Sequence, residues 1–205
     1  MCGIAGLIHK GKTVNIGKEL QDMLQALKHR GPDSTGYALY GEGESDNYIM
    51  RFKVGENVKE GSKAVNEDKS VYDSRRKQVD QHIRDLGANI IQDQQLTPYS
   101  FRYVVKYDKD LMEFSKRVES VKMTEILSMG KTLELVKDIG DATAVSKQYG
   151  LDKIKGTHAI GHSRMATESG VDIRSAHPFW GYPFSDVSVV HNGQLTNYWN
   201  SRRSL

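Results

Sequence analysis

The chain has 205 residues and a single cysteine, Cys2, and this scarcity of thiols strongly constrains its fold. One cysteine excludes an internal disulfide framework and a cysteine-rich zinc site. An apolar core must therefore hold the fold together, and a chain of this length can bury one. Because disulfides belong to oxidising compartments, we expect a cytoplasmic protein.

Charge and hydropathy exclude several other classes of protein. The 29 Lys and Arg residues against 26 Asp and Glu leave a net charge of +3, which is too small and too spread to indicate nucleic-acid binding. No apolar run approaches the ~18–20 residues of a membrane span. The first residues, MCGIAGLIHKG, lack the basic start of a signal peptide. We expect neither a nucleic acid nor a membrane as partner.

Apolar spacing predicts strands and helices in both end regions of the chain, which indicates an α+β fold. A helix is expected over about 15–29, ended by Gly31-Pro32, because proline disfavours helix in the residue before it. Strands are expected at 3–9, 36–41 and 47–53, and again after residue 156 in the runs THAIGHSR and DVSVVHN.

Residues 55–154 differ from both ends, beginning with a charged stretch over 55–80 that is poor in large aliphatic side chains. We interpret them as an inserted α+β module, with 2–54 and 155–205 forming one domain around it. The expected elements are helices around 79–86, 111–121 and 141–150, the last capped by Asp141 and ended near Gly150, and strands at 99–107, 121–129 and 132–137.

Cys2 combines a small side chain with a position next to the initiator methionine. Removal of Met1 would give one residue both a thiol, with a reference pKa near 8.5, and a free α-amine, with a reference pKa of about 7.7–8.0. The amine can then act as a base for its own nucleophile. On position alone, a small buried residue at the start of a strand is the simpler interpretation.

Five sequence blocks, found in a fixed order, change that interpretation. Together they closely resemble the class II glutamine amidotransferases, which are N-terminal-nucleophile hydrolases, and within them the glutamate-synthase-type subunits. The resemblance implies a four-layer αββα sandwich. The blocks are CGIAGL at 2–7, HRGPDSTGYALYG at 29–41, GHSRMATES at 161–169, AHPF at 176–179 and HNGQLTN at 191–197.

The resemblance also implies roles for individual residues. Cys2 would be the nucleophile that attacks the side-chain amide of glutamine, and the Asn192 amide and Gly193 backbone N–H would form the oxyanion hole. Arg164 would bind the α-carboxylate of glutamine, which a two-pronged guanidinium suits better than Lys would. Thr167 would help to shape the same pocket.

Two further groups of residues have less specific interpretations. Arg30 and Asp33 lie in a loop that supports the nucleophile in the family, and they could pair there as a brace. His158 and His162, four residues apart on a predicted strand, read as packed or hydrogen-bonded histidines, and we expect no metal site. His191 reads as a structural neighbour of the oxyanion hole and not as a catalytic base.

The implied chemistry is the glutaminase half-reaction. Glutamine would be hydrolysed through a γ-glutamyl thioester on Cys2, and the ammonia would pass to an FMN-containing synthase subunit of the glutamate-synthase type. The chain has no GxGxxG and no P-loop, so we expect no cofactor on it. Two alternatives stay open: an amidotransferase with another acceptor (phosphoribosyl diphosphate or aspartate), or a non-catalytic fragment that binds glutamine or docks.

The resemblance covers about 105 residues, and the sequence stops at Ser204-Leu205 within a predicted helix. Members of the family continue into an acidic segment whose aspartate binds the α-ammonium group of glutamine, and no residue here matches it. We therefore expect a C-terminally truncated domain.

Overall fold

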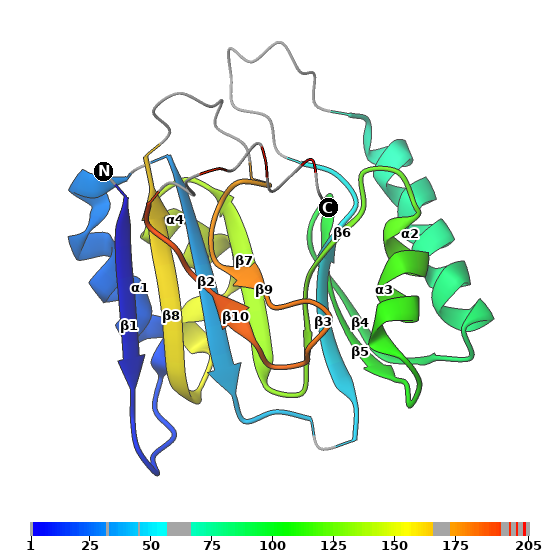
Figure 1. The fold of residues 1–205 in the computed structure, drawn as a ribbon, viewed down its shortest axis with the longest axis horizontal. Coiled ribbons are helices and arrows are strands. Elements are labelled where there is room, and N and C mark those ends of the chain that lie inside the picture. The colour runs from blue at the N-terminus through cyan, green and yellow to red at the C-terminus, as the bar shows by residue number, and fades with distance from the viewer. Residues whose placement is uncertain are drawn as a thin grey trace.

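The computed structural model describes residues 2–31, 33–44, 46–56, 67–165, 173–193, 197, 200 and 203. Within them the chain forms two four-stranded antiparallel sheets with helices packed against both (Figure 1). The expected α+β class is confirmed, and the full four-layer order stays a prediction. No helix among the described residues is long and apolar enough to cross a membrane.

The first sheet joins the two ends of the sequence. Its strand order is β1-β8-β2-β7, and Gly3 pairs with Ser163 across β1 and β8. In Figure 1 the start of β1 and the end of β8 lie side by side at the upper end of the strands. The strands are β1 (Gly3–Ile8), β2 (Ser34–Gly41), β7 (Leu133–Ile139) and β8 (Gly156–Arg164).

Two helices, α1 (Ile16–Ala26) and α4 (Ala142–Tyr149), cover one face of this sheet. Leu20 and Leu24 of α1 are fully buried over Gly161 of β8, and β2 contributes Tyr37 to the same core. A one-turn 3₁₀ helix (Lys28–Arg30) follows α1, and another (Leu151–Lys153) follows α4.

The ends of α4 agree with the expectation from sequence. The Asp141 side chain accepts a hydrogen bond from the Ala144 backbone N–H over 3.0 Å, which satisfies one free donor of the first turn. Gly150 ends the helix with a positive φ of 64°, a conformation that glycine adopts without strain.

The second sheet has the order β4-β5-β3-β6, and α2 (Lys69–Asp85) and α3 (Leu111–Glu119) pack on one face of it. Phe52, Phe101 and Tyr103 form an aromatic cluster in this core. Sequence did not predict β4. The strands are β3 (Tyr48–Lys53), β4 (Asn89–Thr97), β5 (Ser100–Lys106) and β6 (Glu125–Gly130).

The two sheets meet where β7, an edge strand of the first sheet, lies against the second sheet. The Leu135 N–H donates to Ser128 Oγ of β6 over 3.0 Å. Glu134 accepts hydrogen bonds from Arg51 at 2.7 Å and from Arg102 at 2.8 Å, and all three side chains are largely buried. A charged cluster thus fastens one sheet to the other.

This pairing interleaves the two regions that the sequence separated. β7, from the predicted 55–154 module, is hydrogen-bonded to β2 in the first sheet. β3, from the predicted 2–54 part, lies between β5 and β6 in the second sheet. Residues 55–154 are therefore not set apart in the described structure, because their strands complete both sheets.

A short hairpin of β9 (Phe179–Trp180) and β10 (Ser188–Val189) lies over the other face of the first sheet. Trp180 packs against the apolar cluster of β2 and β7, and Ser188 Oγ lies 2.8 Å from the Tyr40 hydroxyl. The β9–β10 hairpin does not cover β1, where Ile8 is 75% exposed. The strand expected in DVSVVHN is thus shorter than predicted.

Candidate active site

The candidate site lies on the inner face of the first sheet, which we define as the face opposite α1 and α4. A Cβ on Gly3 would touch Leu27 at 3.2 Å, so Gly3 faces α1 and the preceding Cys2 faces inward. Ser163 likewise faces α1, because its hydroxyl reaches Leu24 O at 3.5 Å, and so Arg164 faces inward. The Gly3–Ser163 pair then puts Cys2 opposite Arg164.

Cys2 is half-buried and contacts two segments that are distant in sequence. Its Sγ lies 3.9 Å from the Met165 carbonyl oxygen, just beyond β8. The Asn192 side chain donates a hydrogen bond from Nδ2 to the Cys2 carbonyl oxygen over 2.9 Å. Neighbouring Gly193 is exposed, and a Cβ on it would lie 3.0 Å from the His191 ring.

The loop after α1 supports this corner with its backbone. A Cβ on Gly31 would lie 2.5 Å from the Arg164 carbonyl carbon and 2.6 Å from Ser163 O, so only glycine permits this approach. The Asp33 N–H donates to Arg164 O over 3.2 Å, and Asp33 O accepts from Gly140 N. Arg30 is exposed, and its side-chain pairing with Asp33 stays a prediction beside these backbone contacts.

Three histidine rings extend from β8 towards Asn192. The ring of His162 lies 5.1 Å from that of His177, which in turn lies 6.5 Å from that of His191. Gly36 of β2 makes room for this arrangement, because a Cβ there would clash with the His177 carbonyl. His177 was not singled out from the sequence, since nothing in a loop histidine indicates which strand it will cover.

Burial keeps two of these rings uncharged. It lowers the pKa of His162 to about 4, helped by the nearby His177 and Arg164. It lowers the pKa of His177 to about 4 as well, with repulsion from Lys137 as the next cause. Near neutral pH both imidazoles are therefore neutral between two cationic side chains.

Lys137 brings a buried cation to the same face. Lys137 of β7 pairs with Gly36 of β2, which pairs on its other side with His162 of β8. The Nζ of Lys137 lies 3.2 Å from Glu125 and 4.5 Å from the Phe179 ring centre. Burial lowers the pKa of Lys137. Burial opposes ionisation of Glu125 too, but Lys137 and Lys53 outweigh it and lower the pKa of that carboxyl.

The predicted site residues fall into three groups. Cys2, Arg164 and Asn192 come together from three parts of the chain, and Gly193 follows in the same loop. Arg30 and Asp33 lie in the supporting loop. Thr167 lies outside the described residues, as does most of the helix expected at the end of the sequence.

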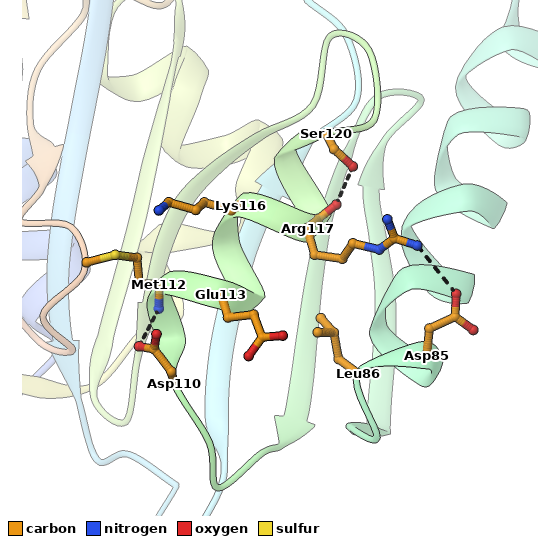
Figure 2. A pocket seen from close by; sticks show the side chains of 8 residues that line it. All are labelled: Asp85, Leu86, Asp110, Met112, Glu113, Lys116, Arg117 and Ser120. Carbon is orange, nitrogen blue, oxygen red and sulfur yellow. Dashed lines mark hydrogen bonds and ion pairs between the residues drawn. The ribbon is translucent and has the colours of Figure 1, made fainter.

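Four cavities in the described part of the chain are lined by none of Cys2, Arg164 and Asn192. One of about 630 Å³ opens between α2 and α3, where the Arg117 guanidinium approaches Asp85 at 3.9 Å (Figure 2). None of its eight lining residues belongs to the Cys2 corner. In the described part of the chain, no group of three or more His, Cys, Asp or Glu side chains is arranged to hold a metal ion.

Comparison with known proteins points to glutamine amidotransferases. No protein-family profile matches the chain. A Methanothermobacter thermautotrophicus protein, provisionally named a glutamine amidotransferase, is 37% identical over 214 residues that cover 100% of this chain and 65% of its own length. The glutamine amidotransferase-like protein GlxB of Rhizobium meliloti is 31% identical over 216 residues, which cover 100% of this chain and 62% of its own length.

A class II enzyme matches over a shorter region. Amidophosphoribosyltransferase 2 of Arabidopsis thaliana is 36% identical over 80 residues, covering 38% of this chain and 14% of the relative. The chain spans slightly less than two thirds of the two relatives that match it throughout. It therefore has glutamine amidotransferase-like homologues, with partial matches to class II amidotransferases.

Proposed function

We propose that this chain carries out the glutaminase half-reaction of a class II glutamine amidotransferase. Cys2, made N-terminal by loss of Met1, attacks the side-chain amide carbon of glutamine. The γ-glutamyl thioester that forms releases ammonia, and water then releases glutamate. The homologues' names support the reaction class.

The observation that carries the proposal is the 2.9 Å hydrogen bond from Asn192 Nδ2 to Cys2 O. It brings a neutral donor to the corner that holds the thiol, although the two residues lie at opposite ends of the sequence. A neutral amide donor is the kind of group that stabilises a developing oxyanion. The neighbouring Gly193 N–H would be the second donor.

The inward-facing Arg164 suits the other end of the substrate. Its backbone is fixed by the Asp33 N–H and by the close approach of Gly31, so the guanidinium starts from a rigid strand end. A planar guanidinium can grip the α-carboxylate of glutamine with two hydrogen bonds. Thr167 would complete this pocket.

The α-amine of Cys2 would serve as the base. Its reference pKa of about 7.7–8.0 lies just below the thiol's value of about 8.5, so the amine can take the thiol proton near neutral pH. With Met1 retained, the amine would sit one residue further away, about 3.8 Å along the chain.

The ammonia acceptor is a separate part of the proposal. We favour an FMN-containing, glutamate-synthase-type subunit, on the resemblance of the GHSRMATES and AHPF blocks. The partial match to amidophosphoribosyltransferase supports phosphoribosyl diphosphate as the alternative acceptor. Neither acceptor changes the roles proposed for Cys2 and Asn192.

The test is glutamate and ammonia release by the purified chain, together with its intact mass. We expect at most slow turnover, because no residue here matches the aspartate that binds the α-ammonium group in the family. We also expect a mass without Met1, and covalent labelling of Cys2 by a glutamine analogue that carries a chloroketone. Cys2→Ala should bind glutamine but release no ammonia, and Arg164→Lys should mainly raise KM. Full activity in Cys2→Ala would overturn the mechanism, and glutamine binding with no covalent labelling of Cys2 in the unaltered chain would favour the non-catalytic alternative.

A further inference from the structure

His162 is a buried polar side chain whose hydrogen-bonding groups no described residue uses. It is 2% exposed, and neither ring nitrogen has a hydrogen-bond partner among the described residues. Burying polar atoms without partners costs free energy, and a phenylalanine would fill similar space without that cost. The imidazole is thus open to a partner beyond the described residues, and a small bound molecule can be that partner.

His158 shows that the strand itself does not explain this. It lies on the same face of β8, four residues earlier, and its ring stacks on Tyr40 at 4.0 Å. Its Nδ1 lies 2.9 Å from Thr157 Oγ1. One histidine of the pair is therefore satisfied within the fold, and the other is not.

The groups around His162 define what such a partner could be. The rings of His162 and His177 are 5.1 Å apart, and Lys137, Arg164 and His191 are the other titratable groups that act on this pair. Lys137 and Arg164 are cations, so they repel a positively charged ligand. Neutral imidazoles offer one acceptor and one donor each. The surroundings therefore favour a small, uncharged molecule that can both donate and accept.

The position of His162 connects it to the proposed chemistry. It pairs with Ile4, two residues after Cys2, on the inner face. Cys2 and His162 are therefore diagonal neighbours on adjacent strands, and such residues lie about 7–8 Å apart. A small molecule that leaves the Cys2 thioester is released close to the His162 ring.

We propose that His162 and His177 form a subsite for a small uncharged hydrogen-bonding molecule, and that in the reaction this molecule is the ammonia released from glutamine. The identity of the molecule rests on the proposed function. In the forward direction the C–N bond of glutamine breaks as the Cys2 thioester forms, and ammonia leaves. In reverse, ammonia attacks the thioester carbon, the C–S bond breaks, and Cys2 recovers its proton.

The reverse step allows a test that separates the subsite from hydrolysis. The purified chain is given glutamine and ¹⁵N-labelled ammonium chloride in mildly alkaline buffer, and ¹⁵N entering glutamine is measured beside glutamate formation. We expect exchange that saturates with ammonia. His162→Phe should lower the ratio of exchange to hydrolysis by about five- to tenfold, the factor that one neutral hydrogen bond is worth. The matched control, His158→Phe, keeps its stack on Tyr40 and should leave the ratio unchanged.

A second measurement does not depend on activity. The imidazole ¹⁵N signals of the protein are followed by NMR as ammonium chloride is added, with sodium chloride at equal ionic strength as control. A saturable shift of the His162 signals that sodium chloride does not cause supports the subsite, even if the chain does not turn over glutamine. No such shift, or an exchange ratio in His162→Phe equal to that of His158→Phe, would overturn it, and would leave water as the remaining partner of the ring.

Discussion

Asn192 donates its side-chain amide to the backbone carbonyl of Cys2 over 2.9 Å, and this single hydrogen bond ties a loop near the end of the sequence to the first strand. The bond fixes the amide beside the thiol and uses one of the two N–H donors of Nδ2. The second N–H can therefore serve the proposed oxyanion while the bond to Cys2 O is kept.

Asn192→Ala should lower kcat for glutamine hydrolysis roughly 10²–10³-fold, because a preorganised oxyanion donor acts mainly in the transition state. KM should change little. Steady-state kinetics on the purified chain measure both, and an unchanged unfolding temperature would show that the loop's hydrogen bond is not needed for folding. A higher KM with unchanged kcat would instead assign Asn192 to substrate binding.

Gly36→Ala should destabilise the fold by about 1–3 kcal/mol, as overpacking of a core does. A Cβ at this position would lie 2.8 Å from the His177 carbonyl carbon and 2.9 Å from Pro178 Cδ, and backbone cannot swing aside as a side chain can. Denaturant unfolding measures the change. Gly6→Ala in β1 is the matched control, since its Cβ would meet nothing nearer than 3.3 Å. Equal effects of the two substitutions would contradict the close packing of the His177 segment on β2.

The stability of the protein should fall as the pH is lowered from about 6.5 to about 4. Burial lowers the pKa of His162 and of His177 to about 4 from a usual 6.5, so over this range the unfolded chain binds protons that the folded chain does not. His162→Phe should weaken this pH dependence, and at pH 7 it should not destabilise, because two unpaired buried nitrogens worth about 1–3 kcal/mol disappear. Denaturation midpoints at pH 7 and pH 5 test both statements. An identical pH dependence in the variant would show that His162 is not protonated on unfolding.

Glu134→Gln should cost about 3–5 kcal/mol of stability, because it leaves the buried Arg51 without its counter-charge. Asp22→Asn removes one partner of the exposed Lys18–Asp22 ion pair and should cost less than about 1 kcal/mol. Chemical unfolding of both variants gives the comparison. Similar losses would mean that the Glu134 cluster is not what fastens β7 to the second sheet.

Sequence predicted the elements whose pattern is local. The apolar runs gave β1, β3, β5 and β8 to within a few residues, and the Asp141 and Gly150 signals marked the ends of α4, because caps depend on neighbouring residues. β4 escaped prediction since its QDQQ core lacks apolar alternation, and it is a strand because β5 supplies its hydrogen bonds.

What sequence could not provide is pairing between distant segments. The division at 54 and 55 followed a change in composition, whereas the sheets follow hydrogen bonding, which takes β7 to β2 and β3 to β5. The family resemblance named Cys2, Arg164 and Asn192, but His177 and Lys137 join them only through the way a loop and an edge strand fold over the sheet.

The β1–β8 pairing has a consequence for how the protein is made. β1 leaves the ribosome before the other strands of its sheet, yet its partner is complete only when Arg164 has been synthesised, so the nascent chain carries an unpaired apolar strand until then. Pairings this distant in sequence also carry a large loop-closure entropy, which slows folding. All four strands and both helices of the second sheet precede β7 in the sequence, so we expect them to fold first and to present a surface on which the first sheet then closes.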